Sequence, residues 1–465
     1  MSEGATAKLP ERIHIIGVAG RHMSAIARVL KAWGHDVRGS DQRSTPLTQE
    51  LEALGVRIYT GHKPEQVGNA QLVVFTSAAR QDNVEMVEAH QRGIEVIKRD
   101  EMVARMMQGR FGVAVAGAHG KTTTSSLMAH MLVEAGLDPM YLIGGIVRSL
   151  GVNAAPGSGR YIVVEADEYD RAFLAYHPDV AVVTNIDPDH LDVFGTIEEM
   201  QRCFAEFMGN VPESGHIVAC TDSPRVAQTV AAGGFAARDI RTYGLDAGAS
   251  WRAHSITQTP EGQQFEVECG GTGFGAFTIA LPGRHNVSNA LAGIVAGNAI
   301  GLETPVIRRA LATFRGAVRR FEYVDDVAGV MVMDDYSHHP TEIRAMVETA
   351  LVRFPDRRLV VLFQPNTFSR NKYLHDEWRR CFEGVDTLYV SDTYAARETP
   401  EAGRTSEQLI DIIETPRAVY AGATEEAAAA VAEVLRPGDV FFTVGSGDID
   451  RANAIVIERL RSRGA

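Results

Sequence analysis

The residues from Val113 to Thr124 read VAVAGAHGKTTT, and this stretch decides the fold of the region around it. Its apolar start predicts a buried β-strand, and the residues after Gly120 predict a helix. A glycine-rich turn between a strand and a helix presents backbone N–H groups that bind phosphate oxygens. Lys121 can reach the β and γ phosphates of a nucleotide, and the hydroxyl of Thr122 can ligate Mg²⁺. The stretch therefore predicts a shortened phosphate-binding loop for ATP, although a chance Gly-Lys-Thr turn is the alternative.

Apolar runs alternate with helical patterns along the chain, in three series. Such alternation is typical of doubly wound sheets with helices on both faces. The segment 251–281 alternates more strictly and is rich in Gly and Thr, which predicts a small antiparallel patch. The sequence thus predicts an α/β fold with three domains: an N-terminal Rossmann-like domain (1–108), a central P-loop-type parallel sheet with the antiparallel patch (109–317), and a C-terminal Rossmann-like domain (318–465). The predicted strands are 12–17, 36–39, 72–76, 95–97, 112–116, 161–165, 180–185, 330–334, 359–363, 387–391 and 440–444.

Composition limits the partners that we expect. The chain has 465 residues and a formal net charge of -13, so we do not expect a broad basic face that binds nucleic acid. The four cysteines are far apart, which favours reduced thiols over a zinc site or a disulfide framework. No run of 18 apolar residues occurs, and the N-terminal residues hold no long apolar segment. We therefore expect no membrane insertion and a cytoplasmic location.

Two polar clusters follow strands of the predicted central domain. Glu165–Asp170 (EADEYD) comes directly after one strand, and Asn185–His190 (NIDPDH) after the next. Ligands of doubly wound sheets bind at the carboxyl ends of the strands, so both clusters are expected beside the phosphate loop. Carboxylates and an imidazole there can hold Mg²⁺ against ATP. The alternative is solvated loop charge, with His190 as a helix-capping or core residue.

The loop after the first strand resembles a dinucleotide-binding fingerprint. Gly17–Ser24 reads GVAGRHMS, and Asp41 follows the second strand, where an acidic residue would bind a ribose hydroxyl. Ala19 and His22 stand where the second and third glycines are expected. A ligand with a pyrophosphate group and an ordinary tight turn are both compatible with this loop. A nicotinamide-dependent oxidoreductase is the alternative function that it suggests.

A further motif, His285–Asn289 (HNVSN), opens a predicted helix after Gly283. Its histidine and asparagine can read adenine by hydrogen bonds or can merely cap the helix.

Nine motifs follow one another along the chain: AGAHGKTTT, EADEYDRAFL, VVTNIDPDHLD, HNVSNALA, FRGAVRRFE, DDYSHHPTEI, FQPNTFSR, DTYAARE and VGSGDI. Their order resembles that of the Mur ligase family, and the resemblance covers the chain from Ile13 to about Ile449. It implies an ATP-dependent ligase that joins L-alanine to the lactyl carboxylate of UDP-N-acetylmuramate through an acyl phosphate, in peptidoglycan precursor synthesis. A recycling ligase of the same family, which joins a murein tripeptide to UDP-N-acetylmuramate, is the alternative. Sister ligases carry a modified lysine after the D-H motif, whereas residues 191–215 contain no lysine, as in the alanine-adding branch.

The resemblance also implies roles for individual residues in ATP and metal binding. Lys121 would neutralise the transferring phosphoryl group, with Glu165, His190 and Arg370 as the other catalytic residues. The implied metal ligands are Thr122, Glu165 or alternatively Glu168, and His190. The implied ATP-binding residues are Gly117, Ala118, His119, Gly120, Lys121, Thr122, Thr123, His285, Asn289, Arg320 and Asp334.

The two other substrates have implied sites as well. His338 and Arg370 would hold the incoming amino acid, because a guanidinium pairs well with a carboxylate. The expected partners are these small molecules alone, and the expected assembly is a monomer or a homodimer. We also expect Lys121→Ala to abolish ligation and leave the fold intact, on the assumption that Lys121 is an exposed loop residue. The residues implied for the UDP group are Gly17, Gly20, Met23, Ser24 and Asp41.

Overall fold

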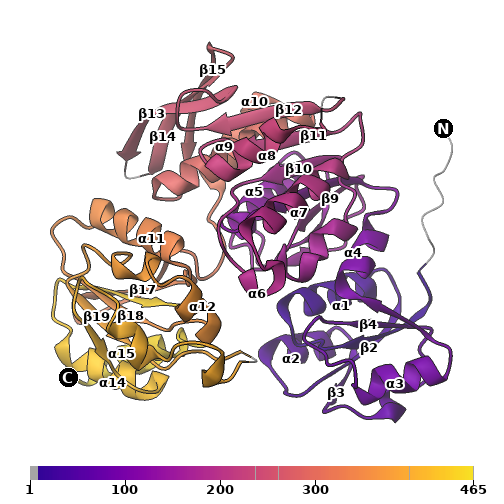
Figure 1. Cartoon of the computed structure of the whole chain (residues 1–465), viewed down its shortest axis with the longest axis horizontal. Helices are drawn as coiled ribbons and strands as arrows, with labels where there is room; N and C mark the ends of the chain where they lie inside the picture. The colour runs from indigo at the N-terminus through magenta and orange to yellow at the C-terminus, as the bar shows by residue number, and fades with distance from the viewer. Residues whose placement is uncertain (1–8, 236, 260, 397, 464–465) are drawn as a thin grey trace. The chain divides into compact units, whose positions relative to one another are not determined.

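The strands of the computed structural model form three sheets of five, ten and six strands (Figure 1). The structure describes residues 9–235, 237–259, 261–396 and 398–463. Within these residues, no helix has the length and apolar character needed to cross a lipid bilayer. All four cysteines are free, as expected. The chain forms two compact units: the first reaches Pro188 and adds Val193–Leu281 and Val287–Ala317, and the second consists of Asp189–Asp192, Pro282–Asn286 and the residues from Val318 onward.

The first sheet is parallel throughout, with the order β3-β2-β1-β4-β5. Four of its strands match the predicted positions. The edge strand β3 was not predicted, because its residues RIYT are half-exposed and form no apolar run. The elements are β1 (Arg12–Ile16), α1 (Arg21–Ala32), β2 (Asp36–Asp41), α2 (Pro46–Ala53), β3 (Arg57–Thr60), β4 (Leu72–Phe75), α3 (Val84–Gln91), β5 (Glu95–Lys98) and α4 (Arg99–Met107).

The second sheet has the order β15-β14-β13-β12-β11-β10-β6-β9-β7-β8. Its middle is parallel, and β13, β14 and β15 form the antiparallel patch that the sequence predicts. The strands are β6 (Phe111–Ala116), β7 (Met140–Leu142), β8 (Ala154–Ala155), β9 (Tyr161–Glu165), β10 (Val180–Val183), β11 (His216–Cys220), β12 (Asp239–Gly244), β13 (Trp251–Thr259), β14 (Gly262–Cys269) and β15 (Thr272–Ile279). The helices are α5 (Lys121–Glu134), α6 (Leu191–Phe194), α7 (Ile197–Gly209), α8 (Pro224–Ala232), α9 (Arg284–Ala299) and α10 (Thr304–Thr313).

The central strand β6 shows why this sheet is buried on both faces. Val113 and Val115 pack into one apolar cluster, which includes Leu127 of α5. Ala114 and Ala116 point the other way, into a second cluster that includes residues of α7. Because side chains alternate along a strand, a continuous apolar run serves both faces. Each fully buried valine contributes about 1.5–3 kcal/mol.

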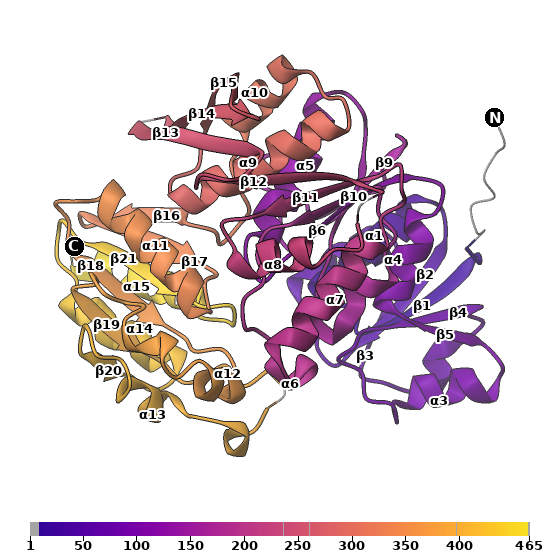
Figure 2. The same cartoon turned by 45° about the horizontal axis from the view of Figure 1, so that its top comes forward.

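The third sheet has the order β16-β17-β21-β18-β19-β20, with only β16 antiparallel to its neighbour. Helix α11 packs on one face, and α14 and α15 pack together on the other (Figure 2). The elements are β16 (Glu322–Val327), β17 (Val330–Asp335), α11 (Pro340–Arg353), β18 (Leu359–Phe363), α12 (Phe368–Tyr373), β19 (Thr387–Val390), α13 (Ser406–Ile410), β20 (Ala418–Tyr420), α14 (Thr424–Val434), β21 (Val440–Val444) and α15 (Arg451–Arg463).

A charged network lies inside the first sheet. The carboxylate of Glu85 is fully buried and accepts hydrogen bonds from the hydroxyl of Ser40 at 2.6 Å and from two imidazoles, His14 at 3.1 Å and His62 at 2.7 Å. Burial alone would raise the pKa of Glu85, but His14, Ser40 and His62 hold it below its usual value. Removing the carboxylate would leave buried polar groups without a partner.

We expect Glu85→Ala to lower the free energy of unfolding by about 3 kcal/mol, because it breaks a buried charge network. In the wild type, the folded state holds the Glu85 proton less tightly than the unfolded state. The ionised Glu85 therefore contributes to the free energy of unfolding above its usual pKa of 4.5, and this contribution is lost as the pH falls below that value. Urea denaturation between pH 7 and pH 3 measures both effects. The control is Glu88→Ala, which removes a half-buried carboxylate of the same helix and should cost less than about 1 kcal/mol. Equal losses in the two variants would contradict the prediction.

Candidate active site

Three neighbouring strands end beside one another at the carboxyl edge of the central sheet. The order β10-β6-β9 places the loop after Ala116 between the segments that follow Glu165 and Val183. The sequence predicted this arrangement for the start of each polar cluster, and the topology confirms it. The last two residues of the second cluster, Asp189 and His190, belong to the other compact unit.

Two glycines give the phosphate loop its shape. Gly117 has φ +139° and Gly120, which precedes α5, has φ +82°, a region that other residues rarely adopt. A Cβ atom on Gly117 would lie 2.1 Å from the hydroxyl of Thr184, and one on Gly120 would lie 2.6 Å from the amide oxygen of Asn289. Both positions therefore require glycine, and the N-terminus of α5 follows the turn directly.

The loop is held on its strand β10 side by hydrogen bonds to Thr184 and Asn185. The backbone N–H of His119 donates to Oδ1 of Asn185 at 2.8 Å, and Nδ2 of Asn185 donates to the carbonyl of His119 at 3.0 Å. The hydroxyl of Thr184 donates to the same carbonyl at 2.6 Å. An asparagine that follows a strand was the only available signal, and it predicts no particular partner.

Lys121 lies inside the site and not on its surface, so the expectation of an exposed loop lysine was wrong. Its side chain is 14% exposed and its ammonium lies 2.8 Å from the carboxylate of Glu168, which is itself 1% exposed. Burial works against the charge, but Glu168, Asp167 and Glu165 together raise the pKa of Lys121. The lysine is therefore a largely buried cation beside the phosphate loop.

Thr122 and Glu165, two of the predicted metal ligands, lie side by side. The hydroxyl of Thr122 donates to Oε1 of Glu165 at 2.8 Å, and the N–H of Gly144 donates to Oε2 at 2.8 Å. The alternative ligand, Glu168, is engaged with Lys121. Within the described parts of the chain, no group of three or more His, Cys, Asp or Glu side chains could hold a metal ion. Mg²⁺ needs only one or two such ligands when phosphates and waters complete its octahedron, so Thr122 and Glu165 fit it.

The predicted adenine pair lies one turn apart on α9. Asn289 is buried and accepts a hydrogen bond from the hydroxyl of Thr124 at 3.3 Å. It thus borders the phosphate loop through both Thr124 and Gly120. His285 is exposed and belongs to the second compact unit.

The first loop, after β1, closes on the residue predicted to bind a ribose. Gly17 has φ +81°, and Oδ2 of Asp41 accepts a hydrogen bond from the N–H of Ala19 at 3.0 Å. Helix α1 starts after Gly20, and Met23 and Ser24 in its first turn are buried. The predicted UDP-binding residues therefore gather at the N-terminus of α1.

His22 replaces an expected glycine and faces the central sheet. Its Nδ1 lies 3.3 Å from Nη1 of Arg99, whose Nη2 donates to Asp167 at 3.3 Å. A small enclosed space of about 10 Å³, room for about one water molecule, is lined by His22, Arg99, Glu165 and Tyr176 and by apolar residues. Burial lowers the pKa of His22, and the charge of Arg99 lowers it further. His22 is therefore a neutral side chain beside Glu165.

In the C-terminal part, Asp334 pairs with Arg319, the sequence neighbour of the predicted ATP-binding residue Arg320. Nε of Arg319 donates to Asp334 at 2.8 Å, and both side chains are buried. The other nitrogens of Arg319 donate to the carbonyls of Gly445 at 2.8 Å and Gly447 at 3.0 Å. Arg320 is 26% exposed and lies 3.6 Å from Glu342.

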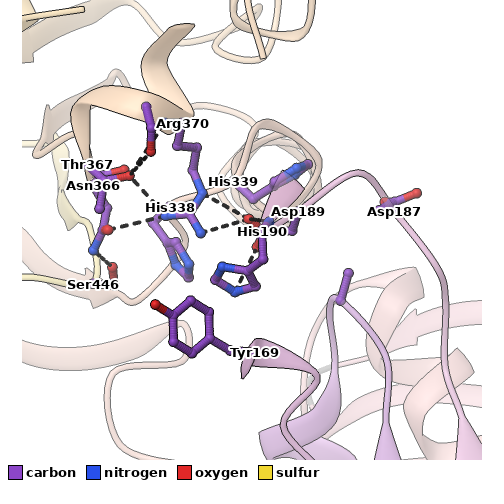
Figure 3. Close-up of polar contacts among 12 residues, drawn as sticks. Tyr169, Asp187, Asp189, His190, His338, His339, Asn366, Thr367, Arg370 and Ser446 are labelled. Carbon is purple, nitrogen blue, oxygen red and sulfur yellow. Dashed lines mark hydrogen bonds and ion pairs between the residues drawn. The ribbon is translucent and has the colours of Figure 1, made fainter. Parts of the chain in front are cut away.

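Arg370, predicted to bind the amino acid, is held by Asp189 (Figure 3). Oδ1 of Asp189 accepts hydrogen bonds from Nε of Arg370 at 3.2 Å and from Nη2 at 2.8 Å. Nη1 of Arg370 donates to the side-chain oxygen of Asn366 at 3.2 Å. Burial would raise the pKa of Asp189, but Arg370 and His190 hold it well below its usual range. This buried ion pair, between residues 181 positions apart, was missed by sequence reasoning.

His338 contributes a neutral imidazole to the same part of the molecule (Figure 3). Burial lowers its pKa to about 4, although Glu342 lies close by. Nδ1 donates to the carbonyl of Tyr336 at 3.0 Å, which makes Nε2 the acceptor in that tautomer. An acceptor of this kind suits an amine.

Two residues beside the ion pair have strained backbones. His190 has φ +53° and Thr367, which caps α12, has φ +64°. Neither is glycine, and such conformations cost roughly 1–3 kcal/mol each and concentrate at functional sites. Both strained residues therefore adjoin the Asp189–Arg370 ion pair.

Family models match most of the chain. The Mur ligase family, catalytic domain model matches residues 12–111, the Mur ligase middle domain model matches residues 115–297, and the Mur ligase, glutamate ligase domain model matches residues 319–447. These three matches correspond to the three sheets.

Curated relatives share the whole length. The chain is 41% identical to the UDP-N-acetylmuramate--L-alanine ligase of a Geobacter species over 97% of this chain and 98% of that protein. It is also 41% identical to the enzyme of the same name from Salinibacter ruber, over 97% of this chain and 96% of that protein.

Solved structures agree with these relatives. The UDP-N-acetylmuramate-alanine ligase of Thermotoga maritima superposes with a TM-score of 0.81 at 27% identity, covering 97% of this chain and 99% of that one. A murein peptide ligase of Psychrobacter arcticus gives a TM-score of 0.74 at 25% identity, with the same coverage. On its sequence and its fold alike, the chain belongs to the Mur ligase family.

Proposed function

We propose that the protein is the enzyme that joins L-alanine to the lactyl carboxylate of UDP-N-acetylmuramate with ATP, through an acyl phosphate. The observation that carries this proposal is the full-length identity of 41% to ligases of that name. A carboxylate is a poor electrophile at neutral pH, and phosphorylation supplies a leaving group. The catalytic work is then mostly positioning and charge neutralisation.

ATP would bind at the loop of Gly117–Thr123, whose backbone N–H groups at the start of α5 suit phosphates. Lys121 would move its ammonium from Glu168 toward the phosphoryl group, as a donor of charge rather than of a proton. Thr122 and Glu165 would share one Mg²⁺, which neutralises charge on the phosphates when it is bound, and His190 would hold the second. Asn289 and His285 would contact the adenine.

Arg370 would take the carboxylate of L-alanine, because it remains a cation at every physiological pH. His338 would accept a hydrogen bond from the amine through Nε2, since its neutral form cannot repel an ammonium group. The first loop, from Gly17 to Ser24, would hold the pyrophosphate of the UDP substrate, with Asp41 near the ribose.

The boundaries at residues 108 and 317 would separate a UDP-substrate-binding domain (1–108), an ATPase domain (109–317) and an amino-acid-binding domain (318–465). We further propose a cytoplasmic enzyme that works as a monomer or homodimer.

Phosphate release tests the proposed substrate directly. The purified protein receives ATP, Mg²⁺ and UDP-N-acetylmuramate, with either L-alanine or the tripeptide L-Ala-γ-D-Glu-meso-diaminopimelate. We expect turnover with L-alanine and none above background with the tripeptide, because the 41% relatives are alanine ligases. Release that requires the tripeptide would assign the recycling reaction instead. Omission of UDP-N-acetylmuramate is the control for simple ATP hydrolysis.

A further inference from the structure

The ion pair between Asp189 and Arg370 has a role beyond stability. Both side chains are buried, with 8% and 9% of their surface exposed. Arg370 has five N–H groups in one plane. Asp189 accepts hydrogen bonds from Nε and Nη2. Asn366 accepts two from Nη1, through its backbone carbonyl at 3.3 Å and its side-chain oxygen at 3.2 Å, so the plane of the guanidinium is fixed from two sides.

We infer that Asp189 is a positioning residue for the incoming amino acid: its carboxylate fixes the guanidinium of Arg370 in the orientation that receives the amino-acid carboxylate. This inference rests on the proposed function, in which Arg370 binds L-alanine. The sequence motif around Asp189 suggested only a metal site, with His190 as the ligand.

In an alternative role, Asp189 occupies Arg370 only in the absence of substrate, and the carboxylate of the amino acid then takes its place. Displacement would leave a buried carboxylate without its counter-charge, which is strongly unfavourable. The same oxygen of Asp189 also accepts the N–H of His190 at 2.9 Å, so the side chain is tied to its own backbone segment. The geometry therefore favours a carboxylate that stays in place while the amino acid binds.

The benefit of a fixed guanidinium is a smaller loss of freedom on binding. Arginine is among the side chains that lose the most rotamer entropy when ordered. A small amino acid offers few contacts to offset that loss, so preorganisation contributes directly to its affinity. Because Asp189 and His190 are consecutive, the ion pair also keeps the guanidinium of Arg370 close to the imidazole of His190, the predicted metal ligand.

Kinetics with Asp189→Asn test the inference. The Michaelis constant for L-alanine should rise about tenfold or more, as when other orienting partners are removed. Those for ATP and UDP-N-acetylmuramate should stay within about twofold. Asp189→Glu, which restores the charge at a different reach, should give an intermediate value. Calorimetric titration of L-alanine, with UDP-N-acetylmuramate and a non-hydrolysable ATP analogue present, should show the same weakening without turnover.

The matched control is Asp439→Asn. It breaks the ion pair, at 2.7 Å, between the buried carboxylate of Asp439 and Arg358, which is 26% exposed. The pair lies at the amino-terminal end of β21 and so away from the site. It should lower the melting temperature like Asp189→Asn, but should leave the Michaelis constant for L-alanine unchanged.

Two results overturn the inference. One is a Michaelis constant for L-alanine in Asp189→Asn that stays within about twofold of the wild-type value. The other is an equal rise in the Michaelis constants for all three substrates. If Asp189→Asn does not fold, an unchanged Michaelis constant for L-alanine in Asp189→Glu also overturns the inference. Wild-type protein that shows no alanine-dependent phosphate release overturns the proposed function itself, and this inference with it.

Discussion

Lys121→Ala should reduce the ligation rate by about 10³-fold or more, the scale of losing a charge that stabilises a transferring phosphoryl group. Lys121 is the cation at the phosphate loop, and the charges of Glu168 and Asp167 keep it protonated. The loss should appear in the maximal rate, because the charge on the phosphoryl group changes most in the transition state. Phosphate release at saturating substrates measures it. Wild-type rates in the variant would refute the assignment of the phosphate loop.

The same substitution should also destabilise the protein, in contrast to what an exposed lysine would do. Without Lys121, the carboxylate of Glu168, which is 1% exposed, loses the ammonium group that lies 2.8 Å away, at a cost of about 3 kcal/mol. For a unit of this size, the melting temperature should then fall by about 5–10 °C. The double variant Lys121→Ala with Glu168→Gln removes that charge and should recover part of the stability but none of the activity. No recovery in the double variant would contradict the buried-pair explanation.

The sequence was informative wherever a local pattern determined the structure. The strand, turn and helix around Gly117–Lys121 were predictable, because glycine positions and an apolar run are visible in a short window. The edge strands β3 and β16 were not, because their half-exposed residues form no apolar run. The three-residue strand β20 and the buried strand β11 (HIVAC) were not predicted either. The antiparallel patch was predictable from its strict alternation.

Contacts between distant residues were beyond a reading of one sequence. Asp189 and Arg370 are 181 residues apart, and nothing in either motif indicates the other. The pairing of Asp334 with Arg319 was missed for the same reason, since two adjacent arginines look equivalent until the backbone directs one of them inward. Arg319 has φ +62°, which turns its side chain toward Asp334.

Arg319→Met should therefore lower the free energy of unfolding of the C-terminal unit by about 3–5 kcal/mol, because it leaves Asp334 buried without its partner. Burial already raises the pKa of Asp334, and Arg319 and Thr443 oppose this effect. In the variant, the folded state would hold the Asp334 proton more tightly than the unfolded state. A folded pKa above the unfolded one gives stability that is present at low pH and lost as the pH rises. The loss of unfolding free energy in Arg319→Met, relative to the wild type, should then be larger at pH 8 than at pH 5. Urea denaturation at the two pH values can measure this difference.

Arg320→Met is the matched control, since it removes the same charge from the adjacent position. Arg320 is 26% exposed and lies 3.6 Å from Glu342, so its loss should cost at most about 1 kcal/mol after screening by solvent. If Arg320 contacts ATP, as the family resemblance implies, this variant should fold normally and show a raised Michaelis constant for ATP alone. Equal destabilisation by the two substitutions would contradict the assignment of Arg319 as the partner of Asp334. A normal Michaelis constant in Arg320→Met would remove Arg320 from the ATP site and leave the stability argument for Arg319 intact.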